Sequence, residues 1–221
     1  MRLNQWLVNQ MSRPSTLTGW LLAGIWNRRN RALNDTALAA LDLAPDDRLL
    51  EVGFGGGYLL DKAKSALPRG FAAGIDASPA LVGLARRRFY ASIQAGRLEI
   101  QCAPAEAIPY PEMRFNSAVS VNSIFYWKDV PKAFNELNRV LEENGRLVLV
   151  FTDKRCLEQR SITRPGRTAL DEWETRYLLQ RAGFHVTAIA RSRDAHRDYL
   201  CILAFKRPDR QSKTTGQPLN R

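Results

Sequence analysis

The residues best suited to chemistry lie in one glycine-rich segment at 49–57, Leu-Leu-Glu-Val-Gly-Phe-Gly-Gly-Gly, and in Asp76, 19 residues beyond it. Glycines allow a tight turn and let a ligand approach the backbone closely. A helix that starts after such a turn offers free N–H groups to the ligand. An acid at the end of the next strand can accept both hydroxyls of a ribose. The pattern therefore predicts a site for a cofactor that contains a nucleoside.

Dinucleotide-binding domains also carry a glycine-rich turn, so the turn alone does not identify the cofactor. Two details separate this chain from them. Glu51 stands two residues before Gly53 in an otherwise apolar strand, and the spacing of Gly53, Gly55 and Gly57 is not Gly-x-Gly-x-x-Gly. The simpler alternative is an ordinary strand-to-helix turn, with Asp76 capping the next helix.

Strand-like and helical segments alternate from residue 35 onward, which predicts an α/β fold with a mostly parallel sheet and helices on both faces. The last two strands, joined by a polar turn, are expected to form an antiparallel hairpin at the edge of that sheet. Asn144 and Gly145 are expected to end the helix that precedes the fifth strand. Strands are expected at 48–53, 71–75, 98–102, 117–121, 146–151, 185–190 and 199–205, and helices at 37–43, 58–67, 80–89, 130–141 and 170–182.

Taken together, the Glu-x-Gly-x-Gly-x-Gly pattern of 51–57 and Asp76 resemble the class I S-adenosylmethionine-dependent methyltransferases, over about residues 35–205. The resemblance implies a doubly wound, seven-stranded sheet in the order 3-2-1-4-5-7-6, with an antiparallel last strand and an N-terminal helical cap. It implies S-adenosyl-L-methionine as the cofactor and S-adenosyl-L-homocysteine as its product. By position, Glu51, Gly53, Gly55 and Gly57 would hold the methionine end, and Asp76 would hold the ribose.

A second segment, Ala-Pro-Ala-Glu-Ala-Ile-Pro-Tyr-Pro at 103–111, resembles the stretch that lies near the adenine in this family. The resemblance places Ala105 and Glu106 beside the base. The chain departs from the family pattern at Pro104 and Asn116, where aspartate is usual.

The segment after the fourth strand, Val-Asn-Ser-Ile-Phe-Tyr-Trp at 121–127, is expected to face the transferring methyl group, because ligands of open parallel sheets bind at the carboxyl ends of strands. It lacks the Asn-Pro-Pro-Tyr type of motif found in DNA-adenine and glutamine methyltransferases. Phe125 and Trp127 could equally pack in the core. We expect Asn122 to bind the cofactor, and Ser123, Phe125 and Trp127 to bind the substrate. Tyr126, Asp153 or His196 is expected to remove a proton. For His196, a solvated histidine in a turn is the commoner explanation.

The net charge of +11 is concentrated at the two ends. Residues 1–34 hold five arginines and no acid, and 206–221 hold five basic residues and one acid. The charge of the chain between these two ends therefore does not predict a nucleic-acid partner. We expect 1–34 to form the cap, 35–206 the methyltransferase domain and 207–221 a basic disordered tail. In the cap, Arg28 or Asn30 could reach the cofactor carboxylate. The alternative is that residues 1–30 lie on an anionic membrane surface.

Several classes of protein are excluded or disfavoured. Three cysteines with only two histidines predict neither a disulfide framework nor a metal site. No apolar run is long enough to span a membrane or to act as a secretory signal, which favours a cytoplasmic protein.

The expected activity is methyl transfer to an O, N or C nucleophile of a small molecule. The basic loop after the fifth strand suggests that this molecule is anionic. The alternatives are an RNA or lipid methyltransferase, a non-catalytic cofactor-binding module and a dinucleotide oxidoreductase; the oligomeric state is not predicted.

Overall fold

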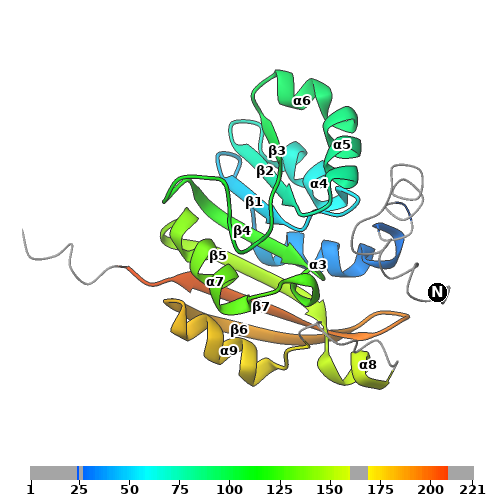
Figure 1. Ribbon diagram of the computed structural model, residues 1–221, viewed down its shortest axis with the longest axis vertical. Helices are drawn as coiled ribbons and strands as arrows, with labels where there is room; N and C mark the ends of the chain where they lie inside the picture. Colours follow the sequence, from blue (N-terminus) through cyan, green and yellow to red (C-terminus); the bar gives the residue numbers. More distant parts are fainter. Residues whose placement is uncertain (1–23, 25–26, 160–168, 209–221) are drawn as a thin grey trace, which may run out of the picture.

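The sheet of this computed structural model has seven strands in the order β3-β2-β1-β4-β5-β7-β6, which confirms the expected topology (Figure 1). The structure describes residues 24, 27–159 and 169–208. Strands β1 to β5 are parallel to one another, whereas β7 is antiparallel to both β5 and β6. The strands are β1 (Arg48–Val52), β2 (Phe71–Asp76), β3 (Leu98–Cys102), β4 (Phe115–Val121), β5 (Leu141–Thr152), β6 (Phe184–Arg193) and β7 (Asp198–Lys206).

Helices cover both faces of the sheet, as alternating side chains of the strands require. On one face, Leu49 of β1 packs in a core that α3, α4 and α5 complete; on the other, Leu50 packs in a core shared with α7 and α9. The helices are α3 (Arg31–Leu41), α4 (Tyr58–Ala66), α5 (Pro79–Arg88), α6 (Tyr90–Gln94), the 3₁₀ turn η1 (Ile124–Tyr126), α7 (Val130–Val140), α8 (Lys154–Gln159) and α9 (Glu172–Arg181).

The boundary between α7 and β5 differs from the expectation. The helix ends at Val140, and Leu141 already pairs with Phe115 of β4. The register then shifts, because the next pair along is Ser117 with Arg146. The prediction that Asn144 and Gly145 end the helix is therefore wrong. Their turn-forming character instead serves an irregularity inside the strand pair, where Asn144 has a φ of 61°.

The first described helix, α3, also starts earlier than expected, at Arg31 rather than residue 37. Leu33, Ala37 and Leu41 are fully buried, so this helix is part of the packed body and runs through the expected boundary at 34/35. Most of the expected cap, residues 1–23 and 25–26, and most of the expected tail, 209–221, lie outside the described residues.

The topology brings six chain segments to one edge of the sheet. The parallel strands β1, β2, β3, β4 and β5 end there, and the turn between β6 and β7, residues 194–197, lies at the same edge because β7 runs in the opposite direction (Figure 1). This carboxyl edge is where ligands of such sheets bind. Among the described residues, no helix is long and apolar enough to span a bilayer.

Candidate functional site

The glycine-rich turn follows β1 directly and is bonded to β2. Gly53, Gly55 and Gly57 have φ values of 77°, 54° and 70°, a region that other residues seldom adopt. The N–H of Gly53 donates to the carbonyl of Ile75 at 2.8 Å, and that of Gly57 donates to Phe54 at 2.8 Å. The turn ends with Gly57 as the N-cap of α4, so it delivers the start of that helix to the carboxyl edge.

The three glycines differ in what surrounds them. A Cβ on Gly53 would lie 2.4 Å from the Cβ of Ser123, and one on Gly57 would lie 2.9 Å from the ring of Phe89. A Cβ on Gly55 would meet no atom of the described residues within 4 Å. Packing therefore requires glycine at 53 and 57, whereas Gly55 borders open space in which a ligand could approach the backbone.

Asp76 ends β2 beside this turn. Its Oδ2 accepts the N–H of Gly55 at 2.9 Å, and its Oδ1 accepts the N–H of Ser78 at 2.9 Å. Burial raises the pKa of this carboxyl group, and the two backbone hydrogen bonds from Ser78 and Gly55 act in the opposite direction. Each carboxylate oxygen can accept a second hydrogen bond. The position is consistent with acceptance of a ribose hydroxyl.

Glu51 is the most unusual group of the site, because it is an acid in the middle of the core. It is 2 % exposed, and its Oε2 has no hydrogen-bond partner among the described residues. Burial raises its pKa well above the ordinary value; a hydrogen bond from the Leu60 N–H lowers it, and the charge of Asp76 raises it further. An unpartnered buried oxygen is costly to the fold, so such groups need an explanation.

These features fit a polar, positively charged group at the turn. The unpartnered oxygen of Glu51 supplies an acceptor, the start of α4 supplies N–H groups, and the space beside Gly55 leaves room for the ligand backbone. The methionine end of S-adenosylmethionine carries an ammonium and a carboxylate, which match these two kinds of partner. The residues present therefore fit the cofactor that the sequence predicts.

The segment at 103–111 is fixed to the sheet and to α7. Ala105 is buried, and the side chain of Glu106 accepts hydrogen bonds from the backbone N–H groups of Lys128 and Asp129. Glu106 thus holds this segment against the start of α7. Its expected place beside an adenine remains a prediction.

Asn122, just beyond β4, links three segments of the carboxyl edge. Its Oδ1 accepts the N–H of Thr152 at 3.2 Å and the hydroxyl of Thr152 at 3.0 Å, and its Nδ2 donates to Asn30 at 3.2 Å. The residue has a φ of 55°, which asparagine tolerates better than most residues. Next to it, the Ser123 hydroxyl donates to the carbonyl of Val52 at 3.0 Å and so joins β4 to β1.

The aromatic residues after β4 are divided between the core and the surface. Phe125 is buried edge-on against Phe151, and Trp127 is buried edge-on against Phe134. This geometry supports packing for these two rings, and their contact with a substrate remains a prediction. Tyr126 between them is 42 % exposed, which leaves it accessible at this edge.

Asp153 follows β5 and is held on both sides. Its Oδ1 accepts the N–H of Arg155 at 2.9 Å, and its Oδ2 pairs with Arg191 at 2.8 Å. It borders a hollow of about 450 Å³ between the end of β5 and the start of α9, where Trp173 is exposed. His196 lies in the β6–β7 turn and is exposed.

The N-terminal segment 27–30 reaches this edge, and its role as part of a cap stays a prediction. Arg28 is exposed, whereas the side chain of Asn30 bonds to Asn122 and to Arg197. Asn27 donates to the carbonyl of Gly56 in the glycine turn at 3.1 Å. The sequence reading missed Arg197 and Asn27. Arg197 lies four residues beyond the end of β6, and its sequence neighbours do not distinguish it from a solvated turn arginine.

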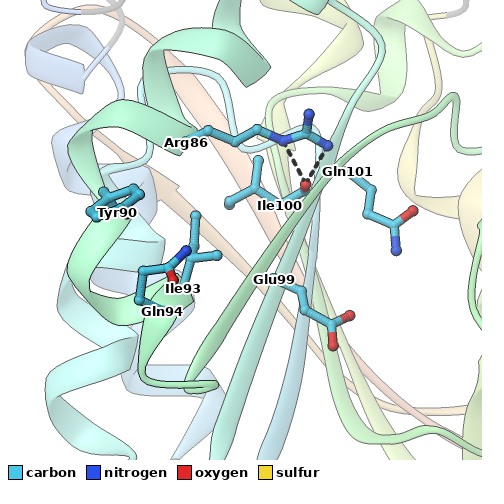
Figure 2. Close-up of a pocket in the computed structure, with 7 residues that line it drawn as sticks. All are labelled: Arg86, Tyr90, Ile93, Gln94, Glu99, Ile100 and Gln101. Atoms are coloured by element: carbon cyan, nitrogen blue, oxygen red, sulfur yellow. Dashed lines mark hydrogen bonds between the residues drawn. The ribbon is translucent and has the colours of Figure 1, made fainter.

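A second hollow, of about 430 Å³, lies on the outer side of β3 (Figure 2). Arg86 crosses it and donates from Nε and Nη2 to the carbonyl of Ile100, at 3.1 and 3.0 Å. The arginine thereby covers a backbone acceptor of the edge strand. None of its lining residues belongs to the glycine turn or to the other segments of the candidate site. Among the described residues, no group of acids, histidines or cysteines is arranged to hold a metal ion.

Comparisons with known proteins identify similar sequences and a similar fold. Residues 50–149 match a family model described as a methyltransferase domain. An uncharacterised methyltransferase of Bacillus subtilis, YdaC, is 27% identical over 135 residues, which cover 61% of this chain and 70% of that protein. The ubiquinone/menaquinone biosynthesis C-methyltransferase UbiE of Geotalea daltonii is 31% identical over 122 residues, which cover 55% of this chain. The match spans about half, 52%, of that relative's length.

Among solved structures, geranyl diphosphate C-methyltransferase of Streptomyces coelicolor superposes with a TM-score of 0.68 at 16% identity. The superposition covers 81% of this chain and 80% of that one. That structure contains geranyl diphosphate and S-adenosyl-L-homocysteine. At this identity the likeness concerns the fold.

Proposed function

We propose that the chain is a class I S-adenosylmethionine-dependent methyltransferase that transfers a methyl group to a nucleophilic carbon, oxygen or nitrogen atom of a small molecule. The observation that carries the proposal is the pair of acids at the ends of two adjacent strands. Glu51 offers a buried, unpartnered oxygen beside the glycine turn, and Asp76 offers acceptors at the next strand. That arrangement suits a ligand in which an amino acid is linked to a nucleoside, with the amino acid at Glu51 and the ribose at Asp76.

We assign the parts of the cofactor as follows. Glu51 and the turn of Gly53, Gly55 and Gly57 hold the methionine end, and Asp76 holds the ribose. Ala105 and Glu106 lie beside the adenine, and the residues at the outer side of the methionine end are Arg28, Asn30 and Asn122. The contacts of Asn122 with Thr152 and Asn30 support its place between the cofactor and the ends of β4 and β5.

S-adenosylmethionine supplies a methyl group on a positively charged sulfur, and its product leaves without charge. The protein therefore needs to align the acceptor and exclude water more than it needs a strong acid. Where the acceptor atom carries a proton, a base must take it. Tyr126 and His196 are candidates at the exposed part of the edge, and Ser123 is a candidate contact for the acceptor. Because Arg155 and Arg191 already occupy both oxygens of Asp153, its geometry supports positioning more than proton removal.

For the acceptor, we propose a hydroquinone or related electron-rich ring as the first class to test. The support is the similarity to UbiE, whose name assigns it C-methylation in ubiquinone and menaquinone biosynthesis. In such a transfer a C–C bond forms, the C–S bond of the cofactor breaks, and the ring loses a proton to a base. The hollow beside Asp153 and Trp173 is a candidate entrance for such a molecule.

The first experiment is calorimetric titration of the purified protein with S-adenosylmethionine, S-adenosylhomocysteine and, as a control, NAD. Micromolar binding of the first two and none of NAD is the expected result. Binding of NAD alone would instead support an oxidoreductase, and absence of any binding would contradict the site.

A second experiment separates an enzyme from a non-catalytic binding module. The release of S-adenosylhomocysteine is measured with reduced quinones as acceptors, and turnover would exclude the non-catalytic module. The truncation that removes 207–221 tests the RNA and lipid alternatives. If either were the acceptor, loss of the basic tail should weaken its binding, whereas the affinity for a quinone acceptor should stay the same.

A further inference from the structure

The carbonyl oxygen of the Asn30 side chain is a junction between distant parts of the chain. It accepts a hydrogen bond from Asn122 Nδ2 at 3.2 Å and another from Arg197 Nη1 at 3.1 Å. The second terminal nitrogen of Arg197 donates to the backbone carbonyl of Arg29 at 2.7 Å. The N-terminal segment 27–30 is thus tied to the end of β4 and to the β6–β7 turn.

Arg197 is itself held in place by its own turn. Asp194 Oδ1 accepts the backbone N–H groups of His196 at 2.6 Å and of Arg197 at 2.8 Å. Asp194 Oδ2 lies 3.5 Å from Arg197 Nε, and both side chains are 9 % exposed. Both terminal nitrogens of this planar guanidinium reach segment 27–30, at Asn30 and at Arg29, and Nη1 also lies 3.5 Å from the hydroxyl of Thr152.

The other end of the same segment contacts the glycine turn. Asn27 Nδ2 donates to the carbonyl of Gly56 at 3.1 Å. Segment 27–30 therefore crosses the carboxyl edge from the turn after β1 to the turn before β7 and lies over the region assigned to the methionine end. Its length is short, and its two ends are held by contacts at Asn27 and at Asn30.

Helix α3, which follows the segment, has anchors that do not depend on Arg197. Leu33, Ala37 and Leu41 are fully buried, and the hydroxyls of Thr36 and Tyr199 lie 3.0 Å apart. Removal of the Arg197 guanidinium would therefore loosen segment 27–30 while the helix stays packed. The contacts of Arg197 position the segment rather than the whole helix.

From this arrangement we propose that Arg197 is a positioning residue for cofactor binding, which holds segment 27–30 over the methionine end through Asn30 and keeps Asn27 on the glycine turn. The inference rests on the proposed function. When the segment is held only part of the time, the apparent dissociation constant of the cofactor rises in inverse proportion to the held fraction. The effect should fall on the amino acid end of the ligand and spare the nucleoside.

The experiment compares two ligands by calorimetry. S-adenosylhomocysteine carries the amino acid end, and methylthioadenosine has the same nucleoside without the amino and carboxylate groups. We expect Arg197→Ala to bind S-adenosylhomocysteine about tenfold more weakly and methylthioadenosine within about twofold of the unsubstituted protein. Arg197→Lys, which keeps a donor, should recover part of the loss. Arg193→Ala is the matched control, because Arg193 is on the same hairpin but 78 % exposed and paired with Asp198.

Trypsin digestion gives an independent readout, since Arg28 and Arg29 are exposed in the segment itself. Saturation with S-adenosylhomocysteine should slow cleavage there in the unsubstituted protein and in Arg193→Ala, and much less in Arg197→Ala. Should Arg197→Ala fail to fold, Arg197→Gln is measured in its place, because it removes the guanidinium and keeps a polar side chain, and it should give the same ligand selectivity.

The outcomes are distinguishable. If the unsubstituted protein binds neither ligand, the proposed function fails. If it binds S-adenosylhomocysteine and Arg197→Ala, or Arg197→Gln in its place, binds it equally well, the role of Arg197 is refuted while the proposed function stands. Equal weakening of both ligands, with a lower melting temperature, would mean that Arg197 only stabilises the fold, and this also refutes the proposal.

Discussion

The backbone N–H of Gly55 donates a hydrogen bond of 2.9 Å to Oδ2 of Asp76, so the glycine turn and the end of β2 are bonded directly to each other. One carboxylate therefore serves two purposes in our assignment. It fixes the conformation of the turn through Gly55, and its remaining lone pairs face the cofactor ribose. Substitution at Asp76 should accordingly affect both the turn and the ligand.

Asp76→Ala should weaken binding of S-adenosylhomocysteine by about 1.5–3 kcal/mol, since hydrogen bonds that involve a charged group are lost. Asp76→Asn should lose less, because its amide oxygen can still accept one of the hydrogen bonds. Calorimetry at fixed pH measures both. Unchanged affinity in the two variants would place the ribose elsewhere.

Gly53 and Gly55 should respond differently to the same substitution. Gly53→Ala places a Cβ 2.4 Å from that of Ser123 and should lower the free energy of unfolding. Gly55→Ala places a Cβ that meets no described atom within 4 Å, so it should cost mainly the strain of the positive φ, about 1–2 kcal/mol. Gly55→Val should fill the open space and abolish cofactor binding. Urea unfolding and calorimetry test the contrast, and equal loss of stability in both alanine variants would contradict it.

The buried acid of β1 should make stability depend on pH. Because the pKa of Glu51 is raised above its ordinary value of 4.5, the folded state holds this proton more tightly than the unfolded state does. The associated stability is fully present below that value and is lost as the pH rises through the pKa of the folded state. Glu51→Gln carries no such proton, so its melting temperature relative to the unsubstituted protein should increase from pH 4 toward pH 8.

Glu143→Gln is the control for that measurement, because Glu143 is an exposed acid in β5. It should leave the pH dependence of the melting temperature unchanged. A constant difference between Glu51→Gln and the unsubstituted protein across this pH range would mean that the pKa of Glu51 is the same in the folded and unfolded states, and this would contradict the prediction.

The fold could be predicted from the sequence because most of its signals are local. The apolar strands, the glycine turn and the helical spacing of Val130, Phe134 and Leu137 each fix one element, and the resemblance supplies the strand order. The end of α7 could not be predicted in the same way. Leu141 continues the apolar spacing of the helix, and only its pairing with Phe115 of the neighbouring strand assigns it to β5.

The candidate cofactor residues could be selected from the sequence, since Glu51, the glycines and Asp76 belong to one compact pattern, and their contacts with a cofactor stay predictions. Arg197 could not be selected, because its role depends on Asn30, which is 167 residues away in the chain. A turn residue of this kind carries no local pattern that distinguishes it from a solvated arginine. Contacts between distant segments, like the packing of Phe125 and Trp127, are properties of the folded chain.

The two interpretations of Trp127 make opposite predictions about stability. Its ring is buried against Phe134, so Trp127→Ala should lower the free energy of unfolding by about 3–5 kcal/mol, as for other large aromatic truncations in cores. A ring whose main role is contact with the acceptor would cost far less. Tyr126→Ala is the comparison at the adjacent, exposed position, and it should change stability by only about 0.5 kcal/mol. Urea unfolding of the two variants distinguishes these roles. A small loss in the free energy of unfolding for Trp127→Ala, together with weaker binding of the acceptor, would indicate that Trp127 contacts the substrate.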